Sequence, residues 1–156
     1  MHRILRWMLF SSIVLSSAAW GHNEHGNDLT GSWRITATIP AGVPVCPGLQ
    51  DCVYPALATA TSDGTILQTA PISNTLTGHG SWKRVSPRSF KVHTVYFRVD
   101  PTTGNYVGTS ETSIEVTVAK DGRTAQGSFA AVVLDVNGVE ITHYTGTVTA
   151  QRILVQ

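Results

Sequence analysis

The stretch Leu29-Thr30-Gly31-Ser32-Trp33-Arg34-Ile35 decides the fold, because it opens the first strand-like run of the chain. At the far end of the sequence, Arg152 closes the last such run. Between these two points Thr and Val are abundant, turn residues recur and no long helical periodicity is present. This pattern is typical of β-strands, so we expect no substantial helix in the mature chain.

Eight strands are expected, and short turns join most of them. The strand ranges are 31–40, 55–62, 65–70, 80–85, 89–99, 106–119, 124–136 and 139–152. Asp63-Gly64, Asp121-Gly122 and Asn137-Gly138 are typical hairpin turns, because these residue types accept the positive φ of a tight turn. Eight strands in such a meander can close on themselves and so remove their free edges. The expected fold class is therefore all-β, an eight-stranded antiparallel up-and-down barrel.

Two long connections shape one end of this expected barrel. They span 41–54 and 71–79, and the alternation of strand direction brings both to the same rim. The other end carries short turns and both termini. The sequence thus predicts a cup with one elaborated end and one closed end.

Gly31-x-Trp33 in the first strand, with Arg152 at the end of the last, resembles the signature of the lipocalins within the calycin superfamily. The resemblance implies that Trp33 packs at the closed base of the barrel and that Arg152 covers it. It also implies a ligand-sized interior, and hence the binding of a small apolar or amphipathic molecule. The chain departs from the family at 120–123, where it has Lys-Asp-Gly-Arg and no Thr-Asp-Tyr motif.

The N-terminal pattern is that of an export signal. Arg3 and Arg6 precede an apolar core of about nine residues, which is too short to span a bilayer, and small residues follow. Cleavage is expected after Ala19 or Gly21. The domain organisation that follows is a signal peptide at 1–21, a flexible N-terminus at 22–29 and a single barrel domain at 30–156. The protein is expected to be secreted or periplasmic.

The two cysteines, Cys46 and Cys52, lie in the exported part and predict one disulfide. Their spacing fits neither a redox C-x-x-C nor a common zinc motif, and no metal or cofactor is expected. Removing the two signal-peptide arginines lowers the net charge from +1 to about −1, with charges interspersed, so a nucleic-acid partner is not expected. No membrane association is expected after cleavage, and the oligomeric state stays open.

Side-chain alternation along 89–99 and 106–119 identifies the inner wall. Lys91, Glu111 and Glu115 should face water, so the opposite faces of these strands should line the interior. The polar groups near the elaborated end would then orient a ligand. The expected ligand-binding residues are Tyr96, Arg98, Tyr106, Asp135 and His143.

An inward Arg98 needs a partner, and the sequence offers two. One is Asp135, and the other is the carboxylate of a bound acid. Two further functions remain open. The first is an enzyme of the cyclase or isomerase kind, similar to allene oxide cyclases, in which Tyr96, Arg98 and His143 would be the polar catalytic groups. The second is a filled barrel without a ligand, which would act as a structural or interaction module. No catalytic motif is present. An interior of about 300 Å³ or more would favour binding or catalysis, and a solid core would favour the filled barrel.

Overall fold

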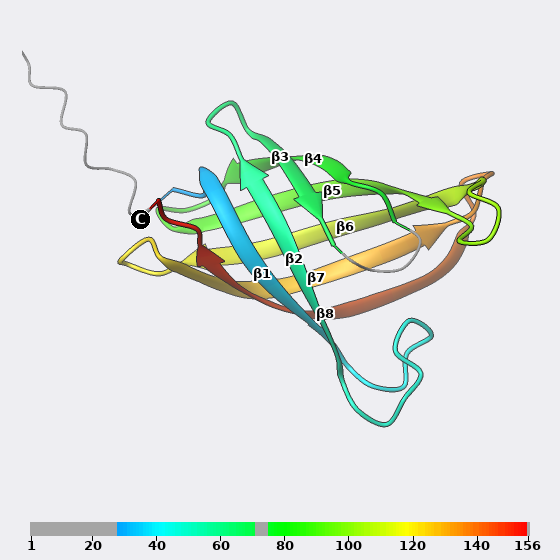
Figure 1. The fold of residues 1–156 in the computed structure, drawn as a ribbon. Coiled ribbons are helices and arrows are strands. Elements are labelled where there is room, and N and C mark those ends of the chain that lie inside the picture. The colour runs from blue at the N-terminus through cyan, green and yellow to red at the C-terminus, as the bar shows by residue number, and fades with distance from the viewer. Residues whose placement is uncertain (1–27, 71–74, 156) are drawn as a thin grey trace, which may run out of the picture.

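A computed structural model describes residues 28–70 and 75–155, which form eight β-strands and no helix. The strands are β1 (Gly31–Ile39), β2 (Cys52–Ala60), β3 (Thr65–Thr69), β4 (Gly78–Arg84), β5 (Ser89–Val99), β6 (Tyr106–Val118), β7 (Thr124–Leu134) and β8 (Glu140–Arg152). Each strand pairs antiparallel with the next, and β8 pairs with β1, so the sheet closes (Figure 1). The predicted all-β, eight-stranded antiparallel up-and-down barrel is confirmed.

The barrel has two distinct ends. We call the end with the β1–β2, β3–β4, β5–β6 and β7–β8 connections the mouth, and the end with the other three connections the base. The predicted signal peptide at 1–21 lies outside the described residues, as do 22–27 of the expected N-terminal segment and 71–74 of the second long loop. Within the described ranges, no helix is long and apolar enough to cross a membrane.

Strand β2 begins three residues earlier than the sequence predicts, at Cys52 and not at residue 55. Pro55 lies inside this strand, although proline has no N–H to donate to a ladder. In the structure β3 pairs with β2 only from Leu57 onward, so Pro55 is paired on one side alone, with Thr36 of β1. Proline is tolerated at such an edge position.

The base of the barrel is closed by Trp33 and Arg152. Trp33 is 2% exposed, and its indole N–H donates to the Leu29 carbonyl over 2.8 Å. The two residues are paired across β1 and β8, and the Arg152 guanidinium carbon lies 4.2 Å from the centre of the Trp33 ring. Gly31 makes room for this contact, because a Cβ there would lie 2.8 Å from Arg152 Nη1. Its φ of +120° also favours glycine.

The Arg152 guanidinium also binds three backbone carbonyls from two segments at the base. It donates to the carbonyls of Gly122, over 2.7 Å from Nε, of Asp28, over 2.6 Å from Nη2, and of Thr30. Burial lowers the pKa of this guanidinium and the charge of Asp28 opposes the shift. One side chain thus ties the start of β1 to the β6–β7 turn.

The outward and inward faces of β5 and β6 follow the predicted alternation over most of their length. Lys91 and Glu115 face outward and form an ion pair of 2.8 Å, whereas Phe90 and Val92 of β5 are buried. The pairing of the two strands shifts register between Arg98 and Val99, near the mouth. This irregularity changes which side chains reach the interior there.

Candidate functional site in the barrel interior

The barrel encloses two small cavities in place of one large cup. The mouth cavity has a volume of about 70 Å³ and the base cavity about 40 Å³. Gln68, Ile114 and Val148 line both, so these side chains cross the lumen and divide it. The interior is therefore far smaller than the 300 Å³ that a drug-sized ligand needs.

Three tyrosines from different strands surround the mouth cavity: Tyr54 of β2, Tyr96 of β5 and Tyr144 of β8. Tyr96 is 6% exposed, and its ring lies against the backbone of Gly78, where a Cβ would approach a ring carbon to 2.5 Å. A larger residue at this point of β4 would push the ring out of position. Apolar side chains complete the wall, namely Ala37, Ile39, Ala56, Ile114, Phe129 and Val148.

The electrostatics of the site keep two of these phenols protonated. Burial raises the pKa of Tyr96, and the neighbouring Tyr144 raises it further. Burial also raises the pKa of Tyr144, although a hydrogen bond with Ser110 and the positive charge of Arg98 act in the opposite direction. Both phenols are therefore hydrogen-bond donors over the whole neutral range.

Three buried polar atoms in or beside this region have no hydrogen-bond partner in the structure: Gln68 Oε1, Thr94 Oγ1 and Arg98 Nη1. Gln68 is 8% exposed and lines the mouth cavity. Leaving a buried polar atom unsatisfied costs about 1–3 kcal/mol, and more for a charged group. Gln68 offers an acceptor inside the cavity, and Arg98 offers a charged donor close to Tyr144.

The structure assigns Asp135 to a turn, so the expected Arg98–Asp135 pair is wrong. Asp135 Oδ1 accepts hydrogen bonds from the amides of Asn137 and Val139, each over 2.8 Å. These bonds stabilise the β7–β8 hairpin and satisfy the carboxylate locally. Among the ion pairs of the described residues, none involves Arg98.

Tyr106, which was expected on the inner wall, and His143, which was expected among the ligand-binding residues, both lie on the outer surface. Tyr106 is 49% exposed and stacks edge to face on the outward Phe97, with 5.8 Å between ring centres. The register shift between Arg98 and Val99 reverses the alternation at this end of β6. His143 points outward from β8 and its Nδ1 lies 2.7 Å from Glu140 Oε1.

Of the expected set, Tyr96 lines the mouth cavity, and Arg98 lies close enough to Tyr144 to act on its charge without lining the cavity itself. Six further polar residues line the cavity, namely Tyr54, Gln68, Thr75, Ser110, Thr112 and Tyr144. Gln68 could have been predicted from the sequence, because it lies on the same face of the strand as the apolar Ile66 and Ala70, which are both buried. Tyr144 was ambiguous, because both faces of β8 carry polar residues.

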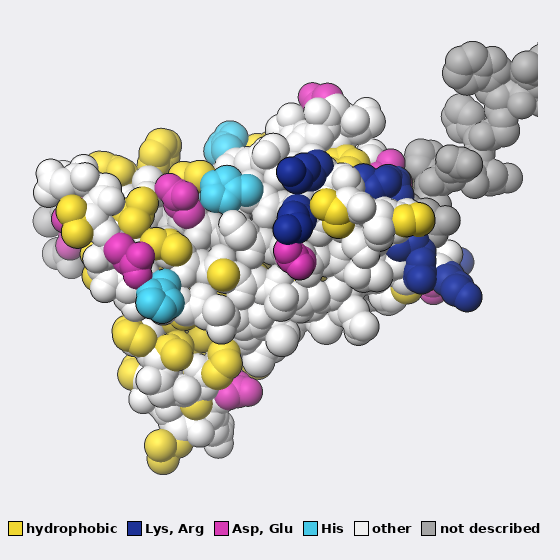
Figure 2. Space-filling model, turned by 180° about the vertical axis from the view of Figure 1, so that it is seen from behind, with side chains coloured by type: hydrophobic (Ala, Val, Ile, Leu, Met, Phe, Trp, Pro, Cys, Tyr) yellow, Lys and Arg dark blue, Asp and Glu magenta, His cyan; other side chains and the backbone are white. Residues whose placement is uncertain are grey.

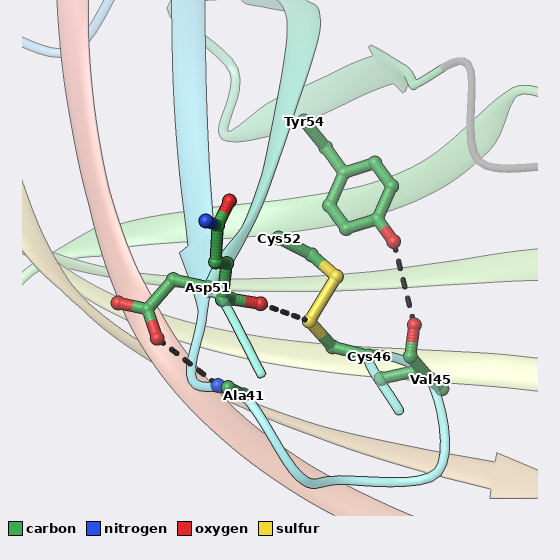
Figure 3. The surroundings of a disulfide bond; sticks show 7 residues. Ala41, Val45, Cys46, Asp51, Cys52 and Tyr54 are labelled. Atoms are coloured by element: carbon green, nitrogen blue, oxygen red, sulfur yellow. Dashed lines mark hydrogen bonds between the residues drawn. A yellow bond between two sulfur atoms is a disulfide. The ribbon is translucent and has the colours of Figure 1, made fainter. Parts of the chain in front are cut away.

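The predicted disulfide between Cys46 and Cys52 is confirmed, with 5.8 Å between the Cα atoms. Figure 3 shows that it joins the β1–β2 loop to the first residue of β2. Tyr54 donates a hydrogen bond of 3.3 Å from its phenol to the Val45 carbonyl of the same loop. The bridge therefore holds the loop against a side chain that lines the cavity.

Comparison of the chain with models of known protein families and with curated protein sequences finds no match.

Proposed function

We propose that the protein binds a compact amphipathic molecule in the mouth cavity. The observation that carries the proposal is the pair of buried polar atoms without a partner, Gln68 Oε1 in the cavity wall and Arg98 Nη1 beside Tyr144. A ligand that supplies a donor to the first and an acceptor to the second would remove both penalties. Apolar walls would hold the rest of the molecule.

The cavity volume limits the size of the ligand. A water-sized group needs about 12 Å³ by this measure, so 70 Å³ holds about six such groups. One ring or a short chain fits, and a long-chain lipid does not. This is a narrower ligand class than the apolar or amphipathic molecules that the sequence suggests.

The charge of the site selects the head group. Tyr96 and Tyr144 stay neutral donors, Arg98 is a cation, and no carboxylate lies among the described residues that line the mouth cavity. A carboxylate or another anionic acceptor is therefore the preferred head group. The sequence offered two partners for Arg98, and one of them, Asp135, forms its hydrogen bonds within its own turn. The carboxylate of a bound acid is therefore the remaining candidate partner.

The wider setting of this proposal is an exported, lipocalin-like binding protein. Its support is the Gly31-x-Trp33 motif with Arg152 stacked on Trp33, the disulfide, and the basic and apolar pattern of the N-terminus. The small interior favours a second candidate function, a filled barrel that acts as a structural module.

A fragment titration separates the two functions. Benzoate has nine heavy atoms and at about 0.5 kcal/mol each should bind with a Kd of about 0.5 mM, within reach of NMR titration. We expect benzoate to shift resonances of Tyr96 and Tyr144, and neutral benzamide to bind more weakly. Arg98→Met should abolish the benzoate shifts without unfolding the barrel, whereas Leu57→Ser on the outer wall should leave them unchanged.

A filled barrel gives the opposite result. If benzoate, short-chain acids and their neutral analogues all leave the interior resonances unmoved, and native mass spectrometry of protein from its own host shows no bound molecule, the binding proposal is wrong.

A further inference from the structure

Charge is segregated between the two ends of the barrel. Among the described residues, the base half carries eight Lys and Arg side chains and four carboxylates, a net charge of +4. The mouth half carries five carboxylates and one cation, Arg98, a net charge of −4. In Figure 2 the basic side chains gather at one end of the molecule, whereas the acidic ones are spread over both ends.

The acidic end also exposes large apolar side chains on its outer rim. Phe97 and Ile141 are each 58% exposed, Val139 is 61% exposed, and Tyr106 stacks on Phe97. The Leu76 amide donates to the Phe97 carbonyl over 3.0 Å, so the half-exposed Leu76 lies beside Phe97. Exposed apolar side chains with a charged border are typical of a protein interaction site. We call these five residues the rim patch.

The carboxylates that border the rim patch hold their charge. Backbone amides of Thr103 and Thr102 lower the pKa of Asp100, and the backbone amide of Val139 is the main cause that lowers the pKa of Asp135. These two carboxylates therefore stay charged at neutral and mildly acidic pH.

The base presents the complementary surface. Lys83, Lys120 and Arg123 are exposed there, and the exposed apolar side chains of Val85 and Leu154 lie at the same end. The base thus offers positive charge together with apolar side chains, and the mouth offers negative charge together with apolar side chains.

We propose that the mouth of one copy, through its rim patch and acidic border, docks on the basic base of a second copy. Opposite charges steer this contact and set its orientation, while the apolar side chains supply buried area. The contact is heterologous, since two different surfaces of the same chain meet, and each copy keeps a free mouth or base for another. The product is a head-to-tail row. The proposal does not depend on a ligand in the mouth cavity.

Sedimentation velocity of the exported chain tests the proposal. We expect weight-average mass to rise with protein concentration at low salt and the rise to shrink at about 0.5 M salt, where charges are screened beyond about 4 Å. Phe97→Ser with Ile141→Ser should abolish self-association, and so should Lys83→Glu with Arg123→Glu. Leu57→Ser, an apolar side chain 53% exposed on the side wall, is the matched control and should associate as the parent does.

A mixture of the two double variants is decisive. The rim variant keeps an intact base and the base variant keeps an intact mouth, so together they should form a 1:1 dimer that grows no further, although each alone is monomeric. A monomeric parent chain at every concentration, or a mixture that stays monomeric, overturns the proposal. So does a rim variant that still associates, or a parent chain that stays monomeric and binds anionic vesicles through its base.

Discussion

The contact between Arg152 and Trp33 at the base gives a quantitative prediction. We consider Arg152→Met, Trp33→Leu and the double variant, each unfolded by urea and followed by far-UV circular dichroism. The guanidinium lies 4.2 Å from the ring centre, and a half-exposed cation–π contact is worth about 1 kcal/mol. Its three bonds to backbone carbonyls add about 1 kcal/mol each at most, because water reaches this site and replaces part of them.

Arg152→Met should therefore lower the free energy of unfolding by about 2–4 kcal/mol. Trp33→Leu should cost about 2–4 kcal/mol, since it removes buried ring area and the indole bond to the Leu29 carbonyl. The double variant should be about 1 kcal/mol more stable than the sum of these losses predicts, because the stacking contact can be lost only once.

Gly31→Ala provides an independent measure of the same packing. The new Cβ would meet Arg152 Nη1 at 2.8 Å and would sit at a φ of +120°, so we expect a loss of about 1–3 kcal/mol. Part of that loss should disappear in an Arg152→Met background, where the close approach is relieved. If the loss of unfolding free energy in the Arg152→Met/Trp33→Leu double variant equals the sum of the two single losses to within about 0.3 kcal/mol, Arg152 and Trp33 do not interact.

Two further predictions concern the mouth. Because the pKa of Tyr96 and of Tyr144 is raised in the folded state above the ordinary value of 10.0, the contribution of these two phenols to stability should be constant below about pH 10. Stability should fall at higher pH, where these phenols ionise readily only in the unfolded chain. Spectrophotometric titration at 295 nm should show two late phenol ionisations, of which Tyr96→Phe removes one, and an unchanged late phase in that variant would contradict the assignment. Replacing Cys46 and Cys52 by Ser should cost about 2 kcal/mol and speed hydrogen exchange in the β1–β2 loop more than in β5 or β6; equal acceleration throughout the barrel would argue against a local role.

The sequence by itself determined the strand order, the turns and the base of the barrel. Hairpin turns such as Asp63-Gly64 and Asp121-Gly122 are local features whose backbone preference does not depend on the rest of the chain. The inward face of β5 follows from Lys91, whose charge must reach water, because alternation along a strand is a local property as well. Trp33 and Arg152 could be paired in advance only through a resemblance to known barrels, since 119 positions separate them.

Only the tertiary structure shows which side chains face the interior at the mouth. The register shift beside Arg98 moved Tyr106 to the outside, and a strand pattern cannot show where a pairing slips. An aspartate such as Asp135 can either stabilise a turn or pair with an interior arginine, and its residue type does not distinguish the two roles. The hydrogen bond from the Asn137 amide shows that Asp135 stabilises the turn. Cavity size is likewise a property of packing, because it depends on how Gln68 and its neighbours from several strands fill one lumen. Local chemistry thus specifies the wall of the barrel, and three-dimensional packing specifies the space inside it.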